Sequence, residues 1–256
     1  MMSDDTPKPP ATKVLGREDR PLPKRFYKEV GLGAILGGFA VLLDGRPVKT
    51  PSQGDVVLPL EALAHAVAEE WASQDIHLQP STMPLTKLCN TAIDRVRGRE
   101  PEIADEIAAY AGSDLVCYRA DRPRSLVQAQ AATWDPVLAW TEAEFGARFV
   151  AIIGLMHQPQ PHGSLQRVRT ALDAFDALAL CALHNMTTLT GSALIPLAHA
   201  HGHLDLATAW AAAHVDEDHQ IAEWGTDDEA LARRAGRWLD MQAAGRLLAF
   251  VHRQAA

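Results

Sequence analysis

The sequence has few cysteines, with only Cys89, Cys117 and Cys181 among 256 residues. They are far apart and form no C-x-x-C pair, which argues against a disulfide framework and against a thiolate zinc site. No apolar run approaches the ~20 residues that cross a bilayer. The first residues, MMSDDTPKPP, are acidic and proline-rich, unlike a signal or transit peptide. These absences predict a cytoplasmic protein without membrane insertion.

Basic residues are also scarce, with 24 Lys and Arg against 32 Asp and Glu. The stretch 205–229 contains eight acids and no Lys or Arg, so it accounts for the whole net charge of −8. Such a charge makes nucleic acid an improbable partner. Aromatic residues are only 6% of the chain, whereas the 43 alanines favour helix.

Motifs of nucleotide binding and nucleophilic catalysis are missing. The glycines of 31–38 do not have G-x-G-x-x-G spacing, and a strand and hairpin follow them where a phosphate site needs a helix. They are interpreted as turn glycines. Neither a G-x-S-x-G nor a G-x-x-x-x-G-K-[ST] sequence is present. The sequence thus predicts no cofactor.

The hydrophobic pattern divides the chain into three parts. Residues 1–23 have no periodicity and are predicted to be a mobile N-terminal arm. Residues 24–84 combine period-two segments, an Asp44-Gly45 turn and one helix, which indicates a small antiparallel β domain. Residues 85–256 are predicted to form a larger helical domain, built like an orthogonal bundle. The fold class is α+β, mostly α.

Helical periodicity predicts helices over 60–71 and 85–96, another from Pro101, and one long helix over 165–179. The segment 114–118 is compatible with a strand or with continued helix. Trp134-Asp135-Pro136 is typical of a helix end followed by a new helix start. Thr226 and Glu229 have capping-box spacing for a last helix. Its inward residues are predicted to be Leu231, Ala235, Trp238 and Leu239.

Three histidines alternate at His199, His201 and His203. On a strand they would share one face like metal ligands, but on a helix only the first and third do so. A helix end at Gly202 also favours imidazoles in its last turn. A metal-dependent enzyme that uses these histidines is therefore kept as the alternative function.

An acidic residue occupies an apolar helix face within 206–224. At 100° per residue, Leu206, Trp210, Ile221 and Trp224 lie within about 40° of one direction, and Glu217 lies only about 20° from Trp210. Burying an unpaired carboxylate costs several kcal/mol. Glu217 must therefore pair with an internal Arg, be protonated, or line a cleft that a partner covers. The flanking tryptophans favour an interaction surface, with Asp216 and Asp218 directed elsewhere into solvent.

Several segments together resemble the ATP-twelve family, the assembly chaperones for the α subunit of the F-type ATP synthase in mitochondria and alphaproteobacteria. The resemblance covers residues 24–250 and is specific through the order of its segments. They are KRFYK at 24–28, FAVLLDGRPVKTP at 39–51, AEEW at 68–71, MPLTKLCNTAID at 83–94, DLVCYR at 114–119, WDP at 134–136, and Asp216-Glu217 through Gln220 to Trp224-Gly225.

This resemblance implies a non-enzymatic protein that holds a newly made α subunit and prevents its aggregation until β subunits replace the chaperone. It implies the α subunit as partner and suggests a monomer, cytoplasmic in bacteria and in the mitochondrial matrix for eukaryotic relatives. Its acidic site falls on Asp216-Glu217, and the predicted partner-binding residues are Glu217, Asp216, Trp210, Gln220 and Trp224. Trp71, Asp94 and Trp134 are predicted to be structural.

Overall fold

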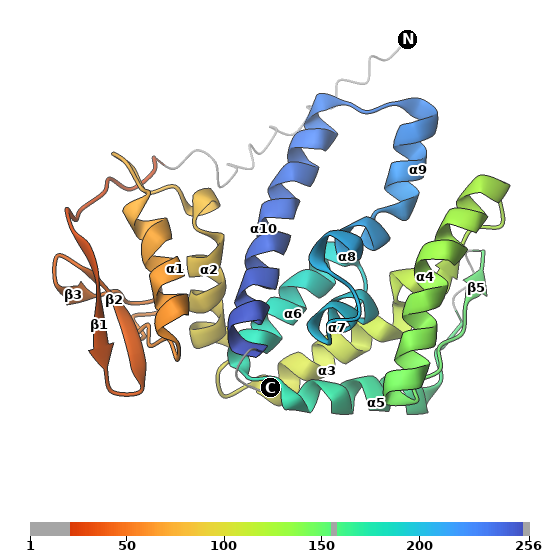
Figure 1. The fold of residues 1–256 in the computed structure, drawn as a ribbon, viewed down its shortest axis with the longest axis horizontal. Helices are drawn as coiled ribbons and strands as arrows, with labels where there is room; N and C mark the ends of the chain where they lie inside the picture. The colour runs from red at the N-terminus through yellow and green to blue at the C-terminus, as the bar shows by residue number, and fades with distance from the viewer. Residues whose placement is uncertain (1–20, 155–157, 253–256) are drawn as a thin grey trace, which may run out of the picture.

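A three-stranded antiparallel sheet is followed by ten α-helices, α1 to α10, in the computed structural model, which describes residues 21–154 and 158–252 (Figure 1). The mainly helical α+β class is therefore confirmed. The predicted N-terminal arm lies, up to residue 20, outside the described residues. None of the helices in the described ranges is long and apolar enough to cross a bilayer.

The sheet consists of β1 (Val30–Ile35), β2 (Gly38–Leu43) and β3 (Arg46–Pro47) in that order. Asp44 and Gly45 both have positive φ, 48° and 78°, as a type I′ hairpin turn requires. The predicted turn is thus confirmed. The interpretation as turn glycines holds only for Gly37, which lies in the turn, and Gly38, which begins β2 directly after it; Gly31 and Gly33 lie within β1.

One face of the sheet packs on α1 (Glu61–Ala72). Val41 and Leu43 of β2 are buried together with Leu63 and Val67 of α1, because strand and helix periodicities each direct apolar side chains to this interface. The predicted helix at 85–96 is present as α2 (Pro84–Thr91), which continues as a π-helical turn over Ala92–Val96.

A half-buried carboxylate holds α1 and α2 together. Glu70 of α1 accepts hydrogen bonds from the backbone nitrogens of Leu85 and Thr86, at 2.8 and 2.7 Å, and from Thr86 Oγ1 at 2.6 Å. Glu70, a residue of α1, therefore supplies the acceptor for N–H groups in the first turn of α2 that have no partner within α2. Burial raises the pKa of Glu70, and these hydrogen bonds oppose that rise.

We expect Glu70→Ala to lower the free energy of unfolding by about 2 kcal/mol, because two helix N–H groups and a buried hydroxyl lose their acceptor. Urea denaturation followed by circular dichroism measures this. Glu69→Ala is the matched control, since Glu69 is exposed and its carboxylate pairs with the exposed Arg246, at 3.4 Å. Equal losses in the two variants would contradict the role given to Glu70.

The helical part has α6 at its centre. This helix is buried on almost every side and packs against α10, α3 and α7, as expected for a helix that is apolar all round. A short parallel pair, β4 with β5, lies beside α4. The remaining elements are α3 (Glu100–Tyr110), β4 (Tyr118–Arg119), α4 (Arg124–Phe145), β5 (Ile152–Ile153), α5 (His162–Ala171), α6 (Ala177–Thr190), α7 (Leu194–Ala200), α8 (Leu206–Ala213), α9 (Val215–Trp224) and α10 (Asp228–His252).

The helix boundary predicted at Trp134-Asp135-Pro136 is wrong. Pro136 lies inside α4, which runs unbroken from Arg124 to Phe145. An internal proline costs about 3 kcal/mol. Burial of Trp134 and of Val137 on the same helix offsets that cost, which the local pattern does not reveal.

Two other helix predictions are corrected. The helix expected over 165–179 is broken between α5 and α6, because Asp176 adopts extended backbone and caps α6 by accepting from the nitrogen of Ala179, at 2.8 Å. The last helix is capped by Asp227, which accepts from the nitrogen of Ala230 at 2.7 Å, and not by Thr226. The undecided segment 114–118 forms a 3₁₀ turn, Leu115–Cys117, that leads into β4.

The inward face predicted for the start of α10 is only partly present. Leu231, Ala235 and Leu239 are exposed, and only Trp238 of the four is half-buried. The first turns of α10 project together with α9 beyond the rest of the helical part (Figure 1), and these apolar side chains remain largely exposed there. Burial begins further along α10, at Met241, Ala243, Ala244, Leu247 and Leu248.

Candidate functional site: the groove between α9 and α10

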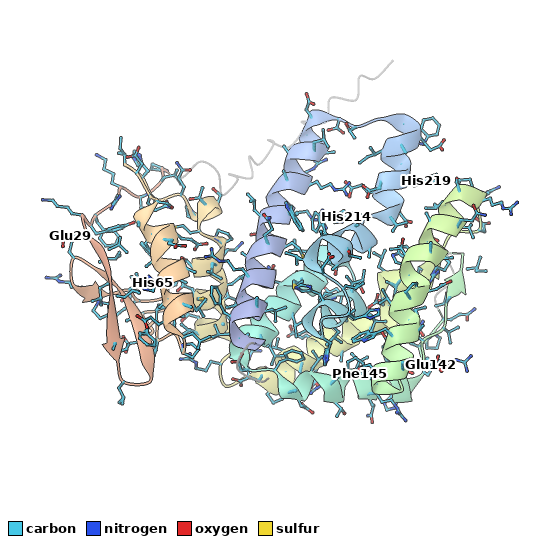
Figure 2. All side chains as sticks on the ribbon, viewed as in Figure 1. Glu29, His65, Glu142, Phe145, His214 and His219 are labelled. Carbon is cyan, nitrogen blue, oxygen red and sulfur yellow. The ribbon has the colours of Figure 1, made fainter. Side chains whose placement is uncertain are left out.

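The acidic segment does not form one helix. His214 has non-helical backbone angles, φ −121° and ψ 17°, and separates α8 from α9. The single apolar stripe predicted over 206–224 is therefore wrong, because the break rotates α9 relative to α8. His214 Nδ1 lies 2.7 Å from the carbonyl oxygen of Trp210, and Figure 2 labels this side chain beside α8.

One face of α9 is attached to α4. Asp216 accepts a hydrogen bond from Gln130 Nε2 at 2.7 Å, and Ser125 Oγ lies 3.0 Å from His219 Nε2. His219 accordingly lies on the side of α9 that faces α4 (Figure 2). Asp216 therefore does not project into solvent, and Asp218 also differs from the prediction because it pairs with Arg234 of α10.

The opposite face of α9 forms a groove with the start of α10. Glu217, Gln220 and Trp224 are spaced by three and four residues, so they lie on one side of the helix. The groove has a volume of ≈ 520 Å³ and continues onto α10. Its other lining residues are Ile221, Gly225, Thr226, Asp227, Ala230, Leu231 and Arg234.

The groove combines exposed apolar side chains with acidic ones. Trp224 is 87% exposed and Leu231 is 46% exposed. Exposed aromatic side chains next to a charged group are typical of protein interaction sites. Trp210, in contrast, is only 9% exposed, and its ring packs 3.9 Å from that of His214 and 5.3 Å from that of Trp238. Trp210 thus lies beneath the groove and is not one of its lining residues.

Glu217 forms no direct ion pair with a Lys or Arg among the described residues, although its charge adds to the hydrogen bond of Asp218 in raising the pKa of nearby Arg234. Its side chain is 39% exposed, and Arg234, which lines the same groove, pairs with Asp218 instead. His214 Nε2 lies 3.7 Å from Glu217 Oε2. Burial lowers the pKa of His214, which disfavours a charged ring beside this carboxylate. The sequence left three alternatives for Glu217: an internal Arg partner, a protonated side chain, or a position in a cleft. In the structure, Glu217 lines a surface groove.

The residues predicted to be structural lie elsewhere. Trp71 packs edge-on against Tyr27 with ring centres 5.7 Å apart. Asp94 accepts from Thr50 Oγ1 at 2.6 Å and from the nitrogen of Ser52 at 3.2 Å, which holds the loop after β3 against the π-helical continuation of α2. Hydrogen bonding lowers the pKa of Asp94. Trp134 is fully buried between α4 and α8.

The three histidines do not converge. His199 Nδ1 lies 2.9 Å from the carbonyl oxygen of Leu204, His203 stacks on Trp140, and His201 packs among aromatic rings. Within the ranges that the structure describes, no group of three His, Cys, Asp or Glu side chains is placed to hold a metal ion. The alternative of a metal enzyme built on these histidines is therefore wrong.

Sequence reasoning missed the contribution of α10 to the groove. Leu231 was assigned to the core, and Arg234 was not singled out. The only local signal was Gly225, whose φ of +82° ends α9 and allows the chain to turn back into α10.

Comparison with known proteins agrees with this architecture. The family model described as "ATP12 chaperone protein" matches residues 24–142. The mitochondrial protein atp12 of Schizosaccharomyces pombe is 23% identical over 232 residues, covering 86% of this chain and 80% of the relative. A solved structure from Agrobacterium tumefaciens is 45% identical with a TM-score of 0.85, covering 89% of this chain and 86% of its own. The crystal structure of Atp12 from Paracoccus denitrificans is 40% identical with a TM-score of 0.82, and the match covers 89% of this chain and 97% of the Paracoccus chain.

The fold and these similarities define a non-enzymatic assembly factor, a chaperone of ATP synthase assembly. The chain belongs to the ATP12 chaperone family, as the resemblance of its segments implies.

Proposed function

We propose that this protein binds the unassembled α subunit of the F-type ATP synthase and prevents its aggregation until β subunits replace it. Subunits of an alternating ring expose apolar interfaces before assembly, and such surfaces self-associate unless they are covered. The observation that carries the proposal is the groove of α9 and α10, which is lined by an exposed Trp224 and by a carboxylate, Glu217, that has no direct ion pair with a Lys or Arg in the described chain.

The chemistry of the groove suggests the group that it binds. Trp224 and Leu231 supply apolar area, and Glu217 supplies two acceptor oxygens on the same side. A lysine or arginine side chain of the α subunit, flanked by an apolar residue, complements this arrangement, because a charge-assisted hydrogen bond forms while the tryptophan excludes water. Asp216 fixes α9 on α4 and Trp210 supports the groove from below, so their contribution to binding is indirect.

The test is the aggregation of purified α subunit, measured by light scattering with each variant of the chaperone. We expect Trp224→Ala to weaken binding by about 2 kcal/mol or more, the loss typical of a central interface tryptophan. Glu217→Gln should cost about 1.5 kcal/mol, because a charge-assisted hydrogen bond becomes a neutral one. Both variants should keep the circular dichroism spectrum of the parent.

Matched controls exist for both changes. Glu223→Gln removes an exposed carboxylate of the same helix that does not line the groove, and Leu36→Ala removes a fully exposed apolar side chain at the tip of the β1–β2 hairpin. Neither should alter protection. If both groove variants protect the α subunit as well as the parent does, the groove is not the binding site. If the parent itself gives no protection, the proposed function is wrong.

A further inference from the structure

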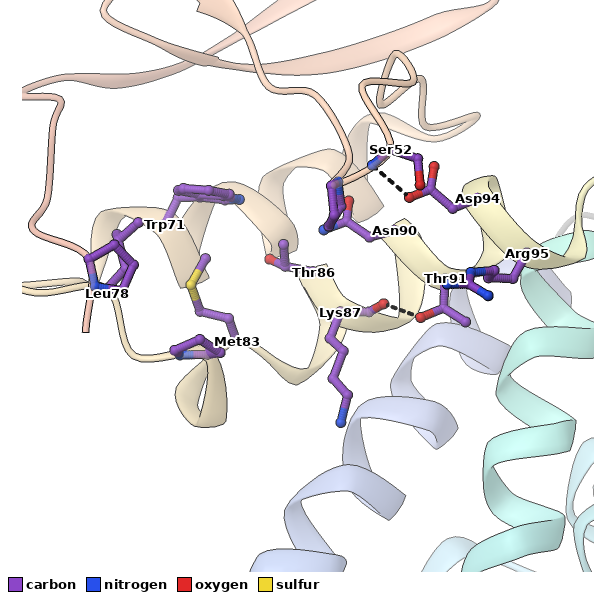
Figure 3. Close-up of a pocket in the computed structure, with 13 residues that line it drawn as sticks. Ser52, Trp71, Leu78, Met83, Thr86, Lys87, Asn90, Thr91, Asp94 and Arg95 are labelled. Atoms are coloured by element: carbon purple, nitrogen blue, oxygen red, sulfur yellow. Dashed lines mark hydrogen bonds between the residues drawn. The ribbon is translucent and has the colours of Figure 1, made fainter. Parts of the chain in front are cut away.

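A second cavity lies far from the groove, at the junction of α1, α2 and the loops of the β domain. It has a volume of ≈ 430 Å³ and contains Trp71, Leu78 and Met83 at one end (Figure 3). Prolines 23, 51 and 80 complete its apolar walls. This volume falls in the range of roughly 300–1,000 Å³ that is usual for ligand sites. In Figure 1, α10 stands between α2 and α9, so the cavity is separate from the groove.

Two basic side chains border this cavity. Lys87 and Arg95 both project from the helix formed by α2 and its π-helical continuation, and both are exposed. Neither forms a salt bridge with any residue in the described ranges. A smaller hollow of ≈ 220 Å³, toward α6 and α10, is lined by the same two cations and by one carboxylate, Asp240. A positively charged edge therefore runs along α2 between two hollows.

The acidic residue of the cavity, Asp94, offsets only part of this charge, because it interacts with Arg95 and is one carboxylate against two cations. Asp94 uses one carboxylate oxygen to accept from Thr50 and the other to accept from Ser52, both in the loop of the β domain. The net charge offered to an occupant is therefore positive.

The cavity wall also contains a hydrogen-bond donor without an acceptor. Trp71 Nε1 is buried and has no partner in the described part of the chain. An unpaired buried donor costs about 1–3 kcal/mol. A carbonyl or carboxylate oxygen of a molecule in the cavity would supply the missing acceptor after a small movement of the ring.

We propose that this cavity binds an extended segment of a partner protein, with an apolar side chain at the Trp71 and Met83 end and carboxylates near Lys87 and Arg95. The spacing favours a peptide over a small carboxylate. The two cations are eight positions apart along the helix, which corresponds to roughly 12 Å. An extended chain covers that length with about four residues. This inference does not depend on the groove of α9 and α10.

The probe is a phage-displayed library of random dodecapeptides, selected on the immobilised full chain. We expect selected peptides in which an apolar residue precedes Asp or Glu by a few positions. A synthetic consensus peptide, measured by fluorescence anisotropy, should lose affinity by about tenfold or more when its Glu and Asp residues become Gln and Asn. Lys87→Gln and Arg95→Gln should each weaken its binding by about tenfold as well.

Three further variants separate binding from folding and from the groove. Arg97→Gln removes an exposed cation near the end of the same helix that does not line the cavity, and it should leave the affinity unchanged. Trp71→Phe keeps most of the ring and removes the unpaired donor, so it should not lower the free energy of unfolding while it weakens peptide binding several-fold. Glu217→Gln should leave the affinity of the peptide unchanged.

The proposal is overturned if the selected peptides lack acidic residues, or if they bind the Lys87→Gln, Arg95→Gln double variant as tightly as the parent. It is also overturned if hexanoate displaces the consensus peptide at the same concentration as unlabelled peptide does, because the site would then be one for small carboxylates. Displacement at that concentration by a peptide of residues 1–20 would assign the cavity to the chain's own N-terminus and would equally contradict the proposal.

Discussion

Replacing Trp134 by alanine is expected to lower the free energy of unfolding by about 3–5 kcal/mol, the range for removing a large buried aromatic side chain. Trp134 is fully buried, and its Nε1 donates to the carbonyl oxygen of Ala212 at 2.7 Å, which joins α4 to α8. The guanidinium of Arg119 lies 5.3 Å from the ring centre. The substitution therefore creates a cavity, leaves a buried carbonyl unpaired and removes a contact of Arg119. Urea denaturation followed by far-ultraviolet circular dichroism measures the loss.

Two further variants divide this effect into its parts. Trp134→Phe fills most of the cavity and leaves the oxygen of Ala212 without its donor, so we expect a loss of about 1–3 kcal/mol. Trp140→Ala makes the same chemical change on the same helix at a half-buried position, where the ring stacks on His203. Its loss should be clearly smaller than that of Trp134→Ala. Equal losses at the two positions would show that Trp134 has no special structural role.

The second large effect is expected at Asp114. This fully buried carboxylate accepts from the nitrogens of Ala193 and Leu194, at 2.8 and 3.1 Å, and from that of Val116 at 3.2 Å. It thus holds the start of α7 against the turn that precedes β4. Asp114→Ala leaves three backbone N–H groups without an acceptor, and we expect it to lower the free energy of unfolding by about 4 kcal/mol or more.

Asp114 also predicts a dependence of stability on pH. Burial raises its pKa to about 6 from the ordinary 3.8, against the effect of its hydrogen bonds. The native protein therefore holds this proton at pH values where the unfolded chain has released it. The contribution of Asp114 to stability is complete below pH 3.8 and decreases by up to about 3 kcal/mol as the pH rises through 6.

Asp114→Asn removes this titration. Between pH 4 and pH 6.5, the free energy of unfolding of the parent should therefore fall relative to that of the Asn variant. Asp205 provides a control of opposite sign, because hydrogen bonds from Thr208 lower its pKa, so its contribution is lost as the pH falls. A difference between the parent and Asp114→Asn that stays constant with pH would refute the assignment.

Much of the fold follows from local patterns. The Asp44-Gly45 hairpin, the helices at 60–71 and 85–96 and the mainly helical class were predictable, because turn chemistry and hydrophobic periodicity act over a few residues. The errors occurred where distant contacts override a local signal. Burial of Trp134 stabilises a helix through Pro136, and His214 leaves helical geometry between two segments that each form a helix.

The candidate site was predictable only in part. Glu217, Gln220 and Trp224 share a helix face whether or not that helix continues toward Trp210, so their grouping follows from spacing alone. Asp216 was misplaced because its partner, Gln130, lies 86 positions earlier in the chain. The sequence pattern places Leu231 in the core, because an amphipathic pattern indicates that one helix face is apolar. Such a pattern does not indicate whether another element covers that face.

Residue order alone therefore determined the class of fold, the family resemblance and the acidic character of 205–229, since each depends on composition or on short spacings. Tertiary structure alone decided that α9 and α10 project together and leave Trp224 exposed, that Trp210 is buried beneath them, and that Lys87 and Arg95 border a cavity with Trp71. The physical reason is that exposure and charge pairing depend on which elements meet in space. The contacts between elements are determined by the packing of the whole chain.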